Sequence, residues 1–386
     1  MVQVIAADTP QQPTSSVPDP YPLLNPPPGI TPEKTRGGFP LSYDTANPHL
    51  AGRPKVGKPL PQPSWTPESR LAYEKRIQWF HDAKFGVMFH FLPRMMRGPK
   101  KEIGEAWAQW DDAKWNAQVD AVDVEKFAEK AKELGVGYVI LSIGQGHGHF
   151  CAPNPVIEAA WKLQPGQGSS KRDLPMDLGK ALAKRGIPIM FYTSTDMPMY
   201  GLAAPEGMPP EERFRQEIKA LEWYSDHYGA LCKGWWLDGL TEHIPGYRED
   251  VTKAVRHGNP DALVTSGSYE ISDFLHGHCT PTNWNKQRTL SRPFYGRWDP
   301  KLQIQWHAFL TVGSTWGSSD TPKNNGQLVD YASDVVRGGG VITFDVGVFP
   351  RGGKGPVLDF PPAQFEQLKK VRDALKDIKP SDGSGR

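Results

Sequence analysis

The chain has 386 residues, of which 38% are hydrophobic and 23% are charged, which is enough material for one large barrel or two smaller domains. Its 45 Lys and Arg residues nearly balance 43 Asp and Glu residues, and the net charge of +2 argues against a protein that binds nucleic acid or an anionic membrane. No apolar run approaches the ~20 residues that a membrane-spanning helix needs, so we expect no membrane span.

The first 65 residues are rich in proline. They hold 15 of the 38 prolines, and a cluster such as Pro26-Pro27-Pro28 fits neither a helix nor a central strand. We therefore predict a Pro-rich extended N-terminal arm over residues 1–65 and a folded domain over residues 66–380. The first residues are similar to the start of a mature exported protein, so we expect a secreted or periplasmic location.

Beyond residue 66, short apolar runs alternate with amphipathic stretches. The run 85–91 predicts a buried strand, and the spacing of Phe127, Ala131 and Leu134 predicts a helix over 123–134. Further strands are predicted at 138–143, 187–193, 234–238, 262–266 and 341–346, and further helices at 173–185, 211–228, 247–257, 327–337 and 362–378.

Strands that alternate with helices in this way indicate a parallel sheet covered by helices. About eight such units favour a single (β/α)8 barrel over an open sheet, with a sixth strand near 280–284, while 306–312 fits either a helix or a strand. The active site of such a barrel lies at the carboxyl ends of its strands. The polar residues found there are His90, His147, His149, Tyr192, Asp196, Asp238, Glu270 and Asp345.

The segment Trp-Trp-Leu-Asp-Gly (235–239) places an acidic residue at the end of a strand, behind two large aromatic side chains. A glycosidase needs a rigidly held carboxylate beneath the anomeric carbon and an aromatic wall for the apolar face of the sugar. Asp238 meets the first requirement. The alternative is a carboxylate that caps the turn after the strand.

Two pairs of histidines share the spacing His-x-His. His147 and His149 point to the same side if the chain is extended, and His276 and His278 repeat the pattern. Such pairs could chelate a metal, contact sugar hydroxyls or be loop residues without a partner. Of these, substrate contact is the preferred interpretation. The chain has no Cys-x-x-Cys pair and no glycine-rich phosphate loop, and we predict no metal and no cofactor.

Taken together in chain order, six segments resemble the α-L-fucosidases of glycoside hydrolase family 29. They are 83–90 (AKFGVMFH), 127–141, 171–194, 235–239, 306–317 and 334–347. The resemblance covers about residues 85–347. It implies a (β/α)8 barrel that acts on fucose or a related sugar.

The resemblance also implies roles for single residues. Asp238 would be the nucleophile of a retaining double displacement. The sequence also departs from the family. Residues 146–150 read GHGHF where the family has HHDGF, 265–268 read TSGS where it has NDRW, and 276–283 hold no carboxylate where it often has its acid/base Glu. His307 and Asp345 stand in place of a Glu and an Asn. The predicted substrate-binding residues are His90, His147, His149, Tyr192, Trp236, His307 and Asp345.

A retaining mechanism also needs a second carboxyl ~5–5.5 Å from the nucleophile, to protonate the leaving oxygen. The candidates are Glu242, Glu270, Asp273 and Asp299. Glu270 is preferred, because it closely follows the fifth predicted strand.

These observations predict a retaining exo-α-glycosidase that releases L-fucose or a related sugar from an oligosaccharide or polysaccharide. One alternative is a lyase or a metal-assisted reaction in the same pocket, because histidines stand where carboxylates are missing. The other alternative is a sugar-binding relative without catalysis. The histidines that motivate the lyase are His147, His149, His278 and His307.

Overall fold

The structure is a computed structural model that describes residues 65–93, 111–145, 148–195, 199–202, 204–240, 242–266, 271–277, 296–299, 302–320, 325–348 and 358–382. The predicted N-terminal arm, apart from Trp65, lies outside these residues. So do His147 and Glu270 and the strand expected near 280–284.

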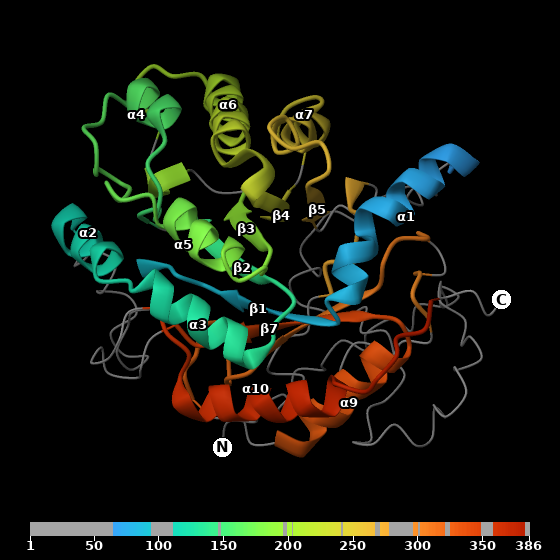
Figure 1. Cartoon of the computed structure of the whole chain (residues 1–386). Helices are drawn as coiled ribbons and strands as arrows, with labels where there is room; N and C mark the ends of the chain where they lie inside the picture. Colours follow the sequence, from blue (N-terminus) through green and yellow to red (C-terminus); the bar gives the residue numbers. More distant parts are fainter. Residues whose placement is uncertain are drawn as a thin grey trace, which may run out of the picture.

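Seven parallel strands form one curled sheet (Figure 1) in the order β5-β4-β3-β2-β1-β7-β6. The strand that the sequence left open at 306–312 is β6. The predicted parallel sheet covered by helices is thus confirmed, and its curl is consistent with the predicted barrel. The strands are β1 (Phe85–Phe89), β2 (Val139–Gly144), β3 (Ile189–Ser194), β4 (Cys232–Asp238), β5 (Leu263–Ser266), β6 (His307–Thr311) and β7 (Val341–Val346).

Between β5 and β6 lies the short segment 271–277. On one side, the Asp273 N–H donates a hydrogen bond to the Val264 carbonyl of β5 at 2.7 Å. On the other side, the Leu275 N–H donates to the Gln305 carbonyl at 3.0 Å, just before β6. Main-chain hydrogen bonds therefore continue across the gap between the two edge strands, through a segment that is not itself a regular strand.

Side chains along each strand alternate between two buried clusters, as the two-residue period of a strand requires. On β4, Trp235 and Leu237 pack in the cluster that includes the covering helices, whereas Trp236 packs in a second cluster on the opposite face. Because both faces are buried, the strands read as unbroken apolar runs. The second cluster also contains Tyr73 and Phe80 of the first helix, which covers that inner face.

The first helix, α1 (Pro67–Asp82), begins at a capping box. Thr66 accepts a hydrogen bond from the Ser69 N–H, Ser69 bonds back to the Thr66 N–H, and Pro67 occupies the first turn. The remaining α-helices are α2 (Asp112–Asp120), α3 (Val124–Leu134), α4 (Pro155–Trp161), α5 (Leu174–Ala183), α6 (Pro210–Tyr228), α7 (Tyr247–Ala254), α9 (Asn325–Arg337) and α10 (Pro362–Leu375).

The helices after the strands pack side by side on the outer face of the sheet (Figure 1). Contacts run from α9 to α10, to α3 and to α5, and a second group joins α4, α6 and α7. All the predicted helices are found, while α1, α2 and α4 are additions that the sequence pattern did not indicate. In the described part of the chain, no helix combines the length and the apolar character that crossing a membrane requires.

Candidate active site

The carboxyl ends of β3 and β4 bring the predicted nucleophile and a tyrosine together. The register pairs Tyr192 with Trp236 and Ser194 with Asp238, so the Tyr192 ring starts one inward-facing level below Asp238. Its hydroxyl reaches up and donates a hydrogen bond to Asp238 Oδ2 at 2.7 Å. Asp238 is partly exposed, and no described residue donates to its Oδ1. One carboxylate oxygen is therefore held and the other is available for chemistry.

Behind Tyr192 stands Gln145, the residue that follows β2. Its amide Nε2 donates to the Tyr192 hydroxyl at 2.9 Å, and only 8% of the residue is exposed. Three strands thus contribute to one line of hydrogen bonds that ends on Asp238. The sequence analysis did not predict Gln145, because a glutamine is neither an acid nor a base and belongs to no recognised catalytic motif.

His90 follows β1 and forms a buried pair with Asp345 of β7. The two strands are neighbours, with Phe89 opposite Val346. His90 Nδ1 donates to Asp345 Oδ1 at 2.5 Å, and Asp345 Oδ2 accepts from the Gly317 N–H at 2.6 Å. Asp345 is 1% exposed, so it acts on the site through His90, whose tautomer it fixes. The carboxylate leaves His90 Nε2 as the ring nitrogen without a described partner.

Aromatic rings surround this pair. The His90 ring meets the Tyr192 ring edge to face, with centroids 5.3 Å apart, and lies 5.9 Å from the ring of Trp316. Trp316 is partly exposed, so it can present apolar surface to a sugar. Trp236, the tryptophan expected in this role, is fully buried, and its ring packs against Phe309 at 4.7 Å. Trp236 supports the floor of the site from below.

His307 lies deeper than the sequence suggested. It starts β6, where the register pairs it with Val341, while the residue of β6 that is level with Asp345 is Thr311. Its Nδ1 donates to the Leu275 carbonyl at 3.0 Å and its Nε2 accepts from the Thr343 hydroxyl at 2.7 Å. With both ring nitrogens engaged and no exposed surface, His307 links β6, β7 and the segment 271–277.

His149 also has a partner away from Asp238. Its Nε2 lies 2.8 Å from Asp112 Oδ1 at the start of α2, and its ring lies over Trp115 of the same helix. Asp112 accepts a second hydrogen bond from the Gly168 N–H. This arrangement ties the chain after β2 to α2. The other members of the two His-x-His pairs, apart from His276, lie outside the described residues.

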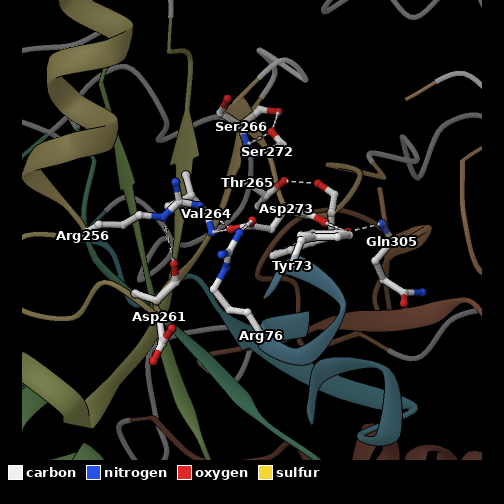
Figure 2. Close-up of polar contacts among 12 residues, drawn as sticks. Tyr73, Arg76, Arg256, Asp261, Val264, Thr265, Ser266, Ser272, Asp273 and Gln305 are labelled. Atoms are coloured by element: carbon white, nitrogen blue, oxygen red, sulfur yellow. Dashed lines mark hydrogen bonds and ion pairs between the residues drawn. The ribbon is translucent and has the colours of Figure 1, made fainter. Parts of the chain in front are cut away.

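Three of the four candidate proton donors are held by other groups. Asp273 pairs with two arginines, Arg76 at 2.7 Å and Arg256 at 2.5 Å, and also accepts from the Val264 N–H (Figure 2). Asp299 is 2% exposed and accepts from the Leu302 N–H in a turn. Both are structural carboxylates.

Glu242 is the third candidate, on the surface beyond β4. Burial, slight here, works to raise its pKa, but hydrogen bonds from the Arg248 and Gly246 N–H groups and from the Arg248 side chain outweigh it and lower the pKa. A general acid needs the opposite shift. Glu270, the preferred candidate, lies outside the described residues. Among the residues that are described, no group of three or more His, Cys, Asp or Glu side chains is arranged to hold a metal.

A parallel sheet covered by helices, with an open carboxylate at the end of a strand, is the architecture of a barrel-type glycoside hydrolase. Sequence comparison gives the family: the α-L-fucosidase profile matches residues 60–376. The chain belongs to the α-L-fucosidase family, glycoside hydrolase family 29. None of the curated proteins matches it.

Solved structures share the fold at low identity. An α-L-fucosidase from Bacteroides thetaiotaomicron is 19% identical, with a TM-score of 0.57 over 78% of this chain and 73% of that one. An endo-fucoidan hydrolase of glycoside hydrolase family 107 is 16% identical, with a TM-score of 0.59, and covers 79% of this chain. This chain spans 54% of that enzyme's length, and a second endo-fucoidan hydrolase, 13% identical, is covered over 96% of its length.

Proposed function

We propose that the protein is a retaining exo-α-glycosidase that releases L-fucose or a related sugar from an oligosaccharide or polysaccharide. The observation that carries the proposal is the state of Asp238. It ends β4, is partly exposed, and has one oxygen held by Tyr192 while the other takes no hydrogen bond from a described residue. A nucleophilic carboxylate needs this combination of fixed direction and a free oxygen.

The proposed reaction has two steps. In the first, Asp238 Oδ1 bonds to the anomeric carbon, the glycosidic bond breaks and a protonated acid gives its proton to the leaving oxygen. In the second, the same group, now a base, takes a proton from water, which displaces Asp238 and releases the sugar with its configuration retained. We assign the acid and base role to Glu270, since Glu242, Asp273 and Asp299 are held by other partners.

The lyase alternative receives less support. It rests on four histidines, and the two that are described, His149 and His307, are engaged with Asp112 and with Leu275 and Thr343. An endo-acting enzyme on a fucose-containing polysaccharide is the more relevant rival, because endo-fucoidan hydrolases share the fold.

Two measurements test the proposal. Proton NMR of the first product formed from an aryl α-L-fucoside should show retained α configuration, and a 2-deoxy-2-fluoro glycosyl fluoride should label Asp238 in a digest analysed by mass spectrometry. Inverted product, or an unsaturated product that absorbs in the near ultraviolet, would refute the retaining mechanism. Chromatography of polysaccharide digests separates exo from endo action: free monosaccharide supports the proposal, and oligosaccharides alone contradict it.

A further inference from the structure

The contacts of Asp345 fix where the proton lies on the His90 ring. The side chain of Asp345 is fully buried, and each of its oxygens has one partner: Oδ1 meets His90 Nδ1 at 2.5 Å and Oδ2 meets the Gly317 N–H at 2.6 Å. A carboxylate can only accept, so Nδ1 must carry a hydrogen. A neutral imidazole has one N–H, and its other nitrogen, Nε2, is therefore an acceptor.

The Nε2 edge of the His90 ring is the edge that opens toward the site. Nε2 has no described partner, and it is not one of the described side-chain nitrogens that are both buried and unpartnered, so it is accessible. The Asp345 side chain covers the opposite edge. The His90 ring lies 5.3 Å from the ring of Tyr192, whose hydroxyl holds Asp238, and 5.9 Å from the ring of the partly exposed Trp316. The accessible nitrogen therefore lies beside the nucleophile and the aromatic surface.

An acceptor nitrogen in the wall of a sugar site distinguishes substituents by their hydrogen-bond polarity. A sugar hydroxyl can donate to the lone pair of Nε2. A fluorine, an ether oxygen or a sulfate ester on the same carbon offers acceptor atoms only, and two facing lone pairs repel each other. A hydrogen on that carbon neither bonds nor repels. The ring should therefore favour a free hydroxyl over hydrogen, and hydrogen over a substituent that cannot donate.

We propose that Asp345 makes His90 an acceptor, and that His90 Nε2 selects a sugar with a free hydroxyl on the carbon that it faces and rejects a sugar that carries an acceptor-only group there. The proposal rests on the proposed function, since it concerns a sugar bound over Asp238. His90 is the specificity residue, and Asp345 is a positioning residue that acts through it. An asparagine at 345 would give its oxygen to the Gly317 N–H and its NH2 group to His90 Nδ1, which moves the ring proton to Nε2 and reverses the selection.

The test compares the unchanged protein with Asp345→Asn on pairs of aryl α-L-fucosides. In each pair one hydroxyl, at carbon 2, 3 or 4, is replaced by hydrogen in one compound and by fluorine in the other. At one carbon the unchanged protein should favour the deoxy compound, and Asp345→Asn should shift the ratio of the two kcat/KM values toward fluorine by roughly tenfold, the value of one hydrogen bond. Electron withdrawal by fluorine slows both proteins alike and cancels when the two ratios are compared.

Two further variants separate this selection from a general loss of structure. The matched control is Asp359→Asn, which changes a 9% exposed carboxylate that pairs with Lys130 at 2.6 Å, and it should leave the ratio of fluoro to deoxy compound unchanged. His90→Phe removes both ring nitrogens, so at the carbon concerned the discrimination against fluorine should disappear without being reversed. Thermal unfolding checks that each variant folds. If Asp345→Asn does not fold, His90→Phe carries the test, and discrimination that persists in it contradicts the proposal.

Equal ratios in the unchanged protein and in Asp345→Asn at all three carbons would overturn the proposal. If the unchanged protein hydrolyses none of the glycosides, the proposed function fails, and the selection is tested by titration calorimetry instead. L-Fucose and its deoxy and deoxyfluoro forms then replace the glycosides in the same comparison. Dissociation constants whose order reverses between the two proteins at one carbon support the role of Asp345 and His90, and equal ratios or no binding by the unchanged protein overturn it.

Discussion

Two carboxylates near the same sheet, one at the end of β4 and one in the segment 271–277 after β5, have opposite surroundings. Asp238, at the end of β4, is partly exposed and receives one side-chain hydrogen bond, from the neutral hydroxyl of Tyr192. Asp273, just beyond β5, has a side chain that is 5% exposed and receives two arginines and a backbone N–H (Figure 2).

The difference lies in how many carboxylate oxygens are engaged by other groups, which decides whether a carboxylate stabilises the fold or can react. Both oxygens of Asp273 are used: Arg76 takes Oδ1, while Arg256 and the Val264 N–H share Oδ2. These partners come from α1, from the turn after α7 and from β5, so the carboxylate joins three parts of the chain. Asp238 has one oxygen without a hydrogen bond from a described residue, and it therefore makes fewer stabilising contacts than Asp273.

The largest expected effect comes from Asp238→Asn. An amide cannot act as the nucleophile, so turnover should fall by at least roughly 10³-fold. Stability should stay within about 0.5 kcal/mol, because the amide oxygen can still accept from Tyr192. Steady-state kinetics and urea unfolding measure the two quantities. Turnover near the normal rate would remove Asp238 from the mechanism.

Asp273→Ala should behave in the opposite way. Removing the carboxylate leaves two arginines facing each other in a largely buried place, and breaking such a buried pair costs about 3–5 kcal/mol. Urea unfolding measures the loss, and activity per folded molecule should stay close to normal. The control is Glu249→Gln, which removes an exposed ion pair with Lys253 and should cost less than about 0.5 kcal/mol.

A drop in activity larger than the drop in folded protein would contradict this assignment of Asp273. Stability unchanged in Asp273→Ala would contradict it as well, since it would mean that the arginines find equal partners elsewhere. Either result would mean that Asp238 and Asp273 do not divide into a catalytic and a structural carboxylate.

The sequence predicted the strands and most helices because burial on both faces leaves a pattern that can be read locally. The run 85–91 and the segment 234–238 are apolar whichever way their side chains point. α1 was missed because its apolar residues do not keep to one face: Tyr73, Ile77 and Phe80 are buried, whereas Leu71 is exposed. Its capping box at Thr66 was the signal that could have found it.

The site was predictable only as far as strand ends can be read from sequence. His90, Tyr192, Asp238 and Asp345 come together because each lies at or near the carboxyl end of a parallel strand. The depth of His307 depends on the register of β6, which no local pattern reveals. The locked state of Asp273 depends on Arg76, almost 200 residues away along the chain, a contact that only the folded chain brings about.

Asp345→Asn tests the pair of His90 and Asp345 and should lower activity less than Asp238→Asn does. The Gly317 N–H needs an acceptor, so the amide oxygen of the asparagine should turn toward it and the NH2 group toward His90. His90 Nδ1 would then have to accept, and the ring proton would move to Nε2. We expect kcat/KM to fall by roughly 10–100-fold, and ¹⁵N NMR of the imidazole to show the change of tautomer. An unchanged tautomer would show that Asp345 does not set it.

A third carboxyl, that of the buried Glu217 on α6, has surroundings intermediate between those of Asp238 and Asp273. It is 2% exposed, but among the described residues its one ion-pair partner, Arg213, is 3.7 Å away, and the Met199 N–H is at 3.4 Å. Burial therefore raises its pKa from 4.5 to about 7, against the weaker opposing effects of Arg213 and Met199. The folded protein holds a proton there that the unfolded chain gives up at lower pH.

Above neutral pH the charged Glu217 lowers the free energy of unfolding, and replacing it with glutamine should remove this loss. The stability supplied by neutral Glu217 is fully present below pH 4.5 and is lost as the pH rises through about 7. Glu217→Gln should therefore raise the free energy of unfolding by about 1–2 kcal/mol at pH 8, where the unchanged protein carries a buried, poorly paired charge. The gain should vanish near pH 4.5. Urea unfolding across this range measures the difference, and a gain that does not depend on pH would mean that Glu217 is neutral throughout or as well paired as Asp273.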